Sequence, residues 1–189
     1  MEKTKFFLLP SRLKRFPRKL AFKLLWLSLF NGDIAEVGVY QGGSAKLICE
    51  ARNENKVLYL FDTFEGLPTP GKFDGSFKKG KYNTSLKYAQ DCLRSYKNVY
   101  FYQEIFPETA SSIENKNFSF VHLDVDIYKS TQDCLEFFYP RMSKGGIILS
   151  HDYSSMGRTP VKKAFDEFFT NKPEAIIEFP TSQCMIIKL

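Results

Sequence analysis

The sequence predicts a single α/β domain with a doubly wound, mostly parallel sheet, and three observations support that prediction. Strand and helix signals alternate from residue 33 onward, which is the pattern of βαβ units with right-handed crossovers. A glycine turn joins the first strand to the first helix. The 189 residues are enough to bury such a sheet beneath helices on both faces. We expect the domain to occupy residues 33–189, after a basic segment formed by residues 1–32.

The expected elements follow from residue periodicity and from capping signals. The strands are expected at residues 33–39, 56–61, 98–103, 118–124, 145–150, 175–179 and 183–188. The helices are expected at residues 44–53, 84–96, 107–114, 130–139 and 160–171. Three of these helices begin with capping signals, which are Ser44, residues 130–133, and Thr159 followed by Pro160. Only residues 180–182 separate the last two strands, so these strands should form an antiparallel hairpin.

Composition and charge narrow the classes of partner. The four cysteines are scattered without a C-x-x-C pair, which disfavours a zinc site and a disulfide framework and makes the cytoplasm the expected location. The net charge of +6 is concentrated at one end of the chain. Residues 1–32 carry eight Lys or Arg against Glu2 alone, whereas the rest has 19 basic and 20 acidic residues. Because nucleic-acid enzymes usually surround their cleft with positive charge, no nucleic-acid partner is expected.

Two interpretations of residues 1–32 stay open. The segment could be a helix that covers the domain edge, with its lysines extending to solvent. It could also be a basic amphipathic helix that contacts an anionic membrane surface or a partner. The longest uncharged run, residues 24–32, is too short to span a bilayer, and no signal-peptide cleavage site precedes the first strand.

Residues 66–83 form a long stretch without a helix or strand signal. A loop of this length in a compact domain is usually functional or disordered. Phe73, Phe77 and Tyr82 argue against plain disorder, so we expect a lid over a binding site.

The glycine turn after the first strand is the first candidate binding site. Gly38, Gly42 and Gly43 permit backbone angles closed to other residues, and the following helix presents free N–H groups and a positive dipole end. Tyr40 stands where dinucleotide enzymes place the glycine that contacts a pyrophosphate. A tyrosine there would obstruct a pyrophosphate but could lie beside a nucleoside with an amino-acid carboxylate, which describes S-adenosylmethionine. The alternative is a tight turn that binds no ligand.

Acidic side chains end the second, fourth and fifth expected strands. Asp62 stands where doubly wound sheets bind a ribose diol, although it could instead cap the following turn. Asp124 and Asp126 close the fourth strand, and His151 and Asp152 close the fifth. If these strands are neighbours, about 4.8 Å apart, Asp126 and Asp152 converge on one hard cation, for which magnesium with several waters fits. The alternative is one helix-capping and one solvated carboxylate.

The two histidines differ in their expected surroundings. His122 lies inside a strand that is covered on both faces, so we expect a hydrogen-bonded core histidine. His151 stands at the carboxyl edge of the sheet, where it could ligate a metal, act as a base or orient Asp152.

Several stretches share an order and spacing with a known family. They are GDIAEVGVYQGGSA (32–45), FDTFEGLP (61–68), LDVDIYKST (123–131), YP (139–140) leading to GG (145–146), and VKKAF (161–165). In these stretches the chain resembles the macrocin O-methyltransferase family, class I methyltransferases that act on sugar hydroxyls of natural products. The resemblance implies a Rossmann-like seven-stranded sheet in the order 3-2-1-4-5-7-6 with strand 7 antiparallel. It also implies S-adenosylmethionine as cofactor and magnesium in the acceptor site.

The resemblance also assigns roles to residues. It makes Asp126 both metal ligand and general base, with Asp152 as second ligand. The family usually has aspartate at position 151, so the chain lacks one oxygen ligand there, and His151 stays a catalytic candidate through its place at the sheet edge. The residues expected to bind the cofactor are Glu36, Gly38, Tyr40, Gly42, Gly43, Ser44, Asp62, Thr63 and Asp124.

The expected activity is therefore O-methyl transfer to a small-molecule or glycan acceptor, and two other functions stay open. An NAD-dependent nucleotide-sugar enzyme is disfavoured by Tyr40 and by the lack of a well-placed Tyr-x-x-x-Lys pair. A non-catalytic, methyltransferase-like binding module is kept open by His151. A homo-oligomer is a further possibility, in which a partner subunit completes the acceptor pocket.

Overall fold

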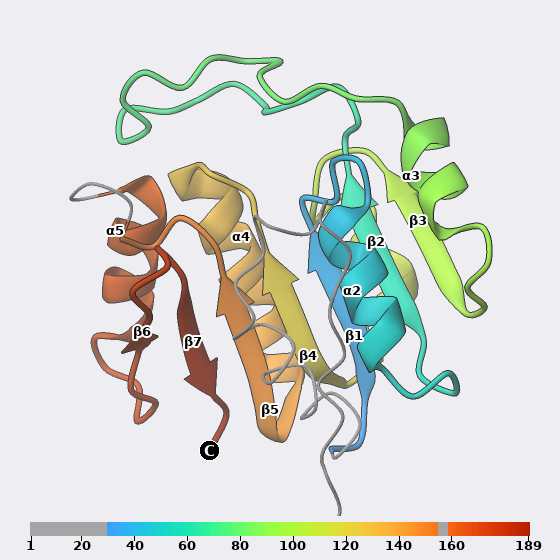
Figure 1. The fold of residues 1–189 in the computed structure, drawn as a ribbon. Coiled ribbons are helices and arrows are strands. Elements are labelled where there is room, and N and C mark those ends of the chain that lie inside the picture. Colours follow the sequence, from blue (N-terminus) through green and yellow to red (C-terminus); the bar gives the residue numbers. More distant parts are fainter. Residues whose placement is uncertain (1–29, 155–158) are drawn as a thin grey trace, which may run out of the picture.

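The structure, a computed structural model, describes residues 30–154 and 159–189. Its core is one seven-stranded sheet in the order β3-β2-β1-β4-β5-β7-β6 (Figure 1). Neighbouring strands from β3 through β5 run parallel, and β7 runs antiparallel to both β5 and β6. The expected fold class, strand order and terminal hairpin are confirmed. Nearly all of the basic segment 1–32 lies outside the described residues, so its two interpretations stay predictions.

The elements have the following bounds. The strands are β1 (Asp33–Val37), β2 (Leu58–Asp62), β3 (Val99–Gln103), β4 (Phe118–Leu123), β5 (Met142–Ser150), β6 (Ile177–Glu178) and β7 (Cys184–Ile187). The helices are α2 (Gly43–Ala51), α3 (Leu86–Leu93), α4 (Tyr128–Phe138) and α5 (Pro160–Phe169), with 3-10 turns η3 (Ala110–Ile113) and η4 (Tyr139–Arg141). Within the described ranges, no helix is long and apolar enough to cross a membrane.

The sheet separates two apolar clusters, because successive residues of a strand face opposite sides. Ile34 of β1 packs with α2 and α3, whereas Ala35 and Val37 pack on the side of α4 and α5. Both faces of the central strands are therefore buried, which explains runs such as Leu58–Asp62 that are apolar almost throughout. Helix α5 buries Val161, Phe165 and Phe169 in the core as one apolar stripe.

Two expected helix starts are wrong. Ser44 is not the cap of α2, since the helix begins at Gly43 and the cap position is Gly42 in a left-handed conformation (φ 82°). Helix α4 begins at Tyr128 rather than at residue 130, and the side chain of Thr131 donates to the carbonyl oxygen of Ile127. The Thr159 cap of α5 is confirmed by its bond from the Lys162 N–H, 2.9 Å long.

The region expected to form a helix over residues 107–114 contains only η3, which is one short turn. The connection between β2 and α3 is a long arch over the carboxyl ends of the strands, and it reaches across to α4 and α5 (Figure 1). This arch contains the expected lid, residues 66–83, and it forms the upper boundary of the candidate site.

Candidate active site

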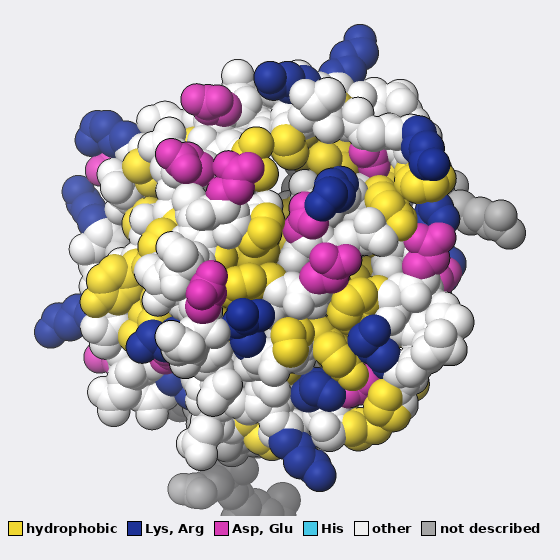
Figure 2. All heavy atoms as spheres, turned by 180° about the vertical axis from the view of Figure 1, so that it is seen from behind, with side chains coloured by type: hydrophobic (Ala, Val, Ile, Leu, Met, Phe, Trp, Pro, Cys, Tyr) yellow, Lys and Arg dark blue, Asp and Glu magenta, His cyan; other side chains and the backbone are white. Residues whose placement is uncertain are grey.

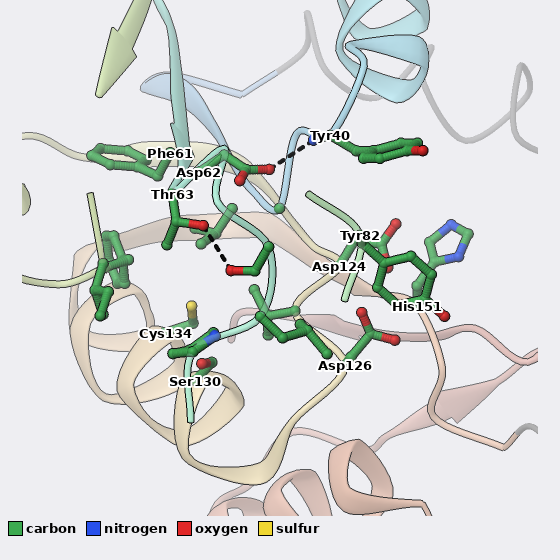
Figure 3. Close-up of a pocket in the computed structure, with 18 of the residues that line it drawn as sticks. Tyr40, Phe61, Asp62, Thr63, Tyr82, Asp124, Asp126, Ser130, Cys134 and His151 are labelled. Atoms are coloured by element: carbon green, nitrogen blue, oxygen red, sulfur yellow. Dashed lines mark hydrogen bonds between the residues drawn. The ribbon is translucent and has the colours of Figure 1, made fainter. Parts of the chain in front are cut away.

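The candidate site lies at the carboxyl ends of two adjacent parallel strands, whose following helices lie on opposite faces of the sheet. β1 leads to α2 on one face of the sheet, and its neighbour β4 leads to α4 on the other. A crevice forms at such a switch point in doubly wound sheets. A cavity of about 370 Å³ opens there, lined by the ends of five strands, by α4 and by the arch (Figure 3).

Gly38 and Asp62 set the shape of the glycine turn. A Cβ on Gly38 would lie 1.9 Å from the Asp124 carbonyl oxygen, so only glycine allows β1 and β4 to approach this closely. The Asp62 carboxylate accepts hydrogen bonds from the N–H groups of Val39 (2.8 Å) and Tyr40 (2.7 Å), as Figure 3 shows for Tyr40. These bonds hold Tyr40 in a left-handed conformation (φ 49°), which usually favours glycine.

Asp62 therefore acts as a turn cap in the structure, which was the alternative to its ribose role. Its second oxygen accepts from the Phe64 N–H at 2.7 Å. A carboxylate has about four acceptor positions, so these three bonds leave room for another donor. Since Asp62 also lines the cavity, its predicted contact with a ribose stays a prediction.

The other predicted cofactor residues divide into two groups. Gly38, Tyr40, Thr63 and Asp124 line the cavity with Asp62. The Thr63 hydroxyl is already engaged, since it donates to the Gly66 carbonyl at 2.8 Å. The residues outside the cavity wall are Glu36, Gly42, Gly43 and Ser44.

Glu36 is fully buried and pairs with His122. Glu36 Oε1 lies 2.8 Å from His122 Nδ1, and Glu36 Oε2 has no hydrogen-bond partner among the described residues. Burial lowers the pKa of His122, but the bond to Glu36 and the charge of Asp124 raise it more, so the net shift is upward. The expectation of a hydrogen-bonded core histidine is confirmed.

His151 lines the cavity and lies close to two buried side chains. The Gln183 side-chain amide donates through Nε2 to His151 Nε2 at 2.6 Å, because an amide nitrogen cannot accept. The His151 ring centre is 5.2 Å from that of His122, in an edge-on arrangement. The structure thus brings His151 to the expected edge, and its choice among metal ligand, base and orienting residue stays a prediction.

Three carboxylates, those of Asp124, Asp126 and Asp152, gather at the ends of β4 and β5, and no donor among the described residues bonds to them. Burial raises the pKa of Asp124 to about 6. Burial and the charges of Asp124 and Asp152 raise the pKa of Asp126 to about 7, and burial also raises the pKa of Asp152. Asp126 (φ 59°) and Asp152 (φ 57°) both have left-handed backbones. Strain of this kind concentrates at functional sites.

A second cavity of about 390 Å³ adjoins these carboxylates on the side of the arch and α5. Asp126, Asp152 and Tyr82 line both cavities, so the carboxylates lie where the two meet. Lys81 lines the second cavity, and its charge partly offsets the raised pKa values of Asp126 and Asp152. A molecule in each cavity would therefore meet the other at these side chains.

The residues present fit a magnesium ion only if two carboxylates are its protein ligands. In the described ranges, no group of three or more His, Cys, Asp or Glu side chains is placed to hold a metal. The pKa values of Asp126 and Asp152 are nevertheless both raised, and one cause for Asp126 is the negative charge of its neighbours. A bound divalent cation would offset that repulsion between like charges. Magnesium keeps several waters and needs as few as one or two carboxylates. These two residues would hold it.

The sequence prediction did not include several lining residues. Ser130 and Cys134 reach the cavity from α4 (Figure 3), where they occupy positions i and i+4 of one helix face. Both residues also lie within the helix expected over residues 130–139, so this spacing could have identified them from the sequence. Tyr82 and Phe106 come from irregular segments, and no local signal in the sequence indicates their orientation.

The sheet order, the glycine turn after β1 and the acid that ends β2 define a Rossmann-like methyltransferase fold. The O-methyltransferase NovP superposes with a TM-score of 0.74, at 23% identity, over 90% of this chain and 79% of its own. Calicheamicin methyltransferase CalS11 superposes with a TM-score of 0.75, at 16% identity, over 89% of this chain and 76% of its own. The chain belongs to the macrocin O-methyltransferase (TylF) family, which matches residues 13–178.

Two curated relatives are similar in sequence. Demethyldecarbamoylnovobiocin O-methyltransferase of Streptomyces niveus is 29% identical over 153 residues, which are 72% of this chain and 58% of that enzyme. Mycinamicin III 3''-O-methyltransferase of Micromonospora griseorubida is 29% identical over 140 residues, which are 65% of this chain and 55% of that enzyme. The chain thus spans a little over half the length of these relatives.

Proposed function

We propose that the protein is an O-methyltransferase that transfers the methyl group of S-adenosylmethionine to a sugar hydroxyl of a glycan, nucleotide sugar or glycosylated natural product. One observation carries this proposal: the two cavities share Asp126, Asp152 and Tyr82. The cofactor occupies the cavity beside the glycine turn, and the acceptor occupies the cavity beneath the arch. Family membership supports both the cofactor and the reaction.

The reaction needs a group that accepts the proton of the acceptor hydroxyl, but it does not need a charged pocket around the cofactor. The sulfonium loses its positive charge during transfer, so apolar walls such as Phe61 and Leu67 do not oppose the reaction. An alcohol barely ionises at neutral pH and must give up its proton as the methyl group arrives. Asp126 has a pKa of about 7, which is well matched to a general base at that pH. His151 is the alternative base.

The proposed metal site assists the same oxygen atom. When bound at Asp126 and Asp152, magnesium supplies a positive charge that lowers the pKa of a hydroxyl. The carboxylates orient the acceptor oxygen toward the first cavity, and Tyr82 lines both cavities beside them. Orientation of this kind contributes a large part of the rate of bimolecular transfers.

The arch indicates the acceptor's chemistry. It carries Lys72, Lys78, Lys79 and Lys81, with Asp74 as its one acid over residues 66–83. Phe73, Phe77 and Tyr82 add aromatic faces, which stack on the apolar faces of sugars. We therefore favour a sugar that carries a phosphate or carboxylate. Figure 2 shows that, on the face opposite to the view of Figure 1, Lys and Arg are interspersed with Asp and Glu rather than gathered in one patch.

Calorimetry and methyl-transfer assays test the proposal. S-adenosylmethionine or its demethylated product should bind with micromolar affinity, whereas NAD should not bind. Labelled methyl transfer should then be measured to TDP-rhamnose, the substrate named for one CalS11 structure that superposes with a TM-score of 0.66 at 17% identity, and to other nucleotide sugars, with and without magnesium. NAD binding without S-adenosylmethionine binding would contradict the proposal. Cofactor binding without transfer to any sugar would favour the non-catalytic binding module.

A further inference from the structure

The arch contains one buried residue between positions 68 and 83, and that residue is an aspartate. Asp74 has only 2% of its surface exposed, while its neighbours along this stretch are exposed or half-buried. A carboxylate at the tip of a surface loop usually points to solvent, because burying an unpaired charge is costly. Its burial here therefore requires specific hydrogen-bond donors.

Both oxygens of Asp74 accept hydrogen bonds from backbone N–H groups. Oδ2 accepts from Gly71 at 2.6 Å, which closes the turn at the tip of the arch. Oδ1 accepts from Tyr128, the first residue of α4, at 2.7 Å. The residue at the cap position of α4, Ile127, has no side chain that could make this bond. Asp74 thus caps a helix that begins 54 residues further along the chain.

Capping by a carboxylate is favourable for two reasons. The first N–H groups of a helix have no partner inside the helix, and the helix dipole places positive charge at that end. α4 contains 11 residues, so its first turn presents both effects fully. The contact is therefore a charge-assisted bond between the arch and the fixed body of the domain.

Aromatic contacts extend this attachment. The ring of Phe73 lies 4.7 Å from that of Tyr128, at an angle of 62°. Lys163 Nζ of α5 lies 4.5 Å from the centre of the Phe73 ring. The Tyr128 hydroxyl donates to Glu167 of α5 at 2.6 Å, so the arch is held over the gap between α4 and α5.

The attachment lies next to the proposed chemistry. Tyr128 follows Asp126 by two residues, so the bond to Asp74 also fixes the turn that leaves β4. Beyond Asp74, the arch returns through Lys81 and Tyr82, which line the second cavity. Release of Asp74 would therefore move one wall of the cavity and loosen the turn that carries Asp126.

We propose that Asp74 is a positioning residue that latches the arch onto the amino end of α4 and so completes the acceptor cavity. The latch itself follows from the contacts of the described residues. Its effect on the acceptor rests on the proposed function. The two parts can be tested separately, because the position of the arch can be measured without any turnover.

Limited proteolysis under native conditions tests the latch. Trypsin cleaves after lysine, and the arch offers Lys72, Lys78, Lys79 and Lys81. The variant Asp74→Ala should be cut within the arch about tenfold faster, the change expected when a helix cap is lost. Asp74→Asn keeps one acceptor and should be cut at an intermediate rate. Asp91→Ala removes an exposed aspartate of α3 and serves as the matched control, with an unchanged rate.

Kinetics with TDP-rhamnose, or whichever nucleotide sugar proves active, test the functional part. Asp74→Ala should raise the acceptor KM about tenfold, with a smaller change in kcat and an unchanged affinity for S-adenosylmethionine. Equal cleavage of wild type and both Asp74 variants would overturn the latch, whether or not the protein methylates sugars. Faster cleavage with an unchanged acceptor KM would overturn the positioning role. If Asp74→Ala does not fold, Asp74→Asn decides both questions by the same criteria.

Discussion

A set of three partly buried carboxylates (Asp124, Asp126 and Asp152) and the single buried carboxylate of Glu174 lie at opposite ends of the sheet. The pKa shifts are upward in the set and downward at Glu174. At the carboxyl ends of the parallel strands, burial and neighbouring charges raise the pKa of Asp126 to about 7. At the other end, Glu174 is buried, with 4% exposed. Burial acts to raise the pKa of Glu174 as well, but bonds from Lys188 and Tyr139 lower it to about 2.

The difference lies in the donors that the fold supplies. Glu174 accepts from Lys188 Nζ at 2.7 Å and from the Tyr139 hydroxyl at 2.8 Å, so its charge is satisfied within the domain. No hydrogen-bond donor of the described residues reaches the Asp126 carboxylate. A buried carboxylate that the fold leaves without donors, beside a cavity, is typical of a group that serves a ligand rather than the fold. We therefore expect Asp126 to serve the proposed chemistry and Glu174 to stabilise the fold.

The largest expected effect is on catalysis at the set of three carboxylates. Asp126→Asn keeps the shape of the side chain but removes its basicity, so methyl transfer should fall about 10²- to 10⁴-fold. Affinity for S-adenosylmethionine should be nearly unchanged, because Asp126 acts on the acceptor. Single-turnover rates and calorimetry on the same preparation measure the two quantities. Wild-type protein that keeps full activity after EDTA treatment would show that the magnesium assignment is wrong and would leave His151 as a candidate base.

The next effect concerns stability at Glu174. Glu174→Gln should lower the free energy of unfolding at pH 7 by about 2 kcal/mol, since bonds to an ionised group are lost. The pKa of Glu174 is lowered on folding, so its stabilisation is present above the unfolded-state value of about 4.5 and is lost as the pH falls toward about 2. Urea titrations should therefore show the two proteins converging at low pH. Glu178→Gln, at an exposed position of β6, is the control. If the free energy of unfolding of Glu174→Gln were lower than that of wild type by the same amount at every pH, the charge of Glu174 would not be the cause.

The smallest expected effect concerns the lysines of the arch. Replacing Lys72, Lys78, Lys79 and Lys81 with serine should raise the acceptor KM several-fold, and more steeply at low salt, because exposed charges are screened by ions. A matched variant replaces four exposed lysines elsewhere, namely Lys46, Lys87, Lys97 and Lys116. Identical kinetics of the two variants on the true acceptor would leave the arch without a role in recognising an anionic group.

The fold could be predicted because strand and helix signals depend on residues that are close together in the sequence. Alternating strand and helix signals, together with the family resemblance, predict the strand order, and the carboxyl ends of parallel strands then bring Asp62, Asp126 and Asp152 to one edge. The features that the sequence prediction missed depend on contacts between distant residues. The start of α4 was wrong because its cap, Asp74, lies 54 residues away. Tyr82 could not be placed because the path of an irregular segment depends on where that segment docks.

The left-handed backbones of Asp126 and Asp152 have an evolutionary consequence. A non-glycine residue in this conformation costs roughly 1–2 kcal/mol, and both side chains also hold raised pKa values in a buried setting. Glycine at either position would relieve strain and remove a buried charge, so the fold would gain stability as it lost its base or metal ligand. Selection for stability alone would therefore favour glycine at these two positions, whereas selection for catalysis would retain aspartate at both.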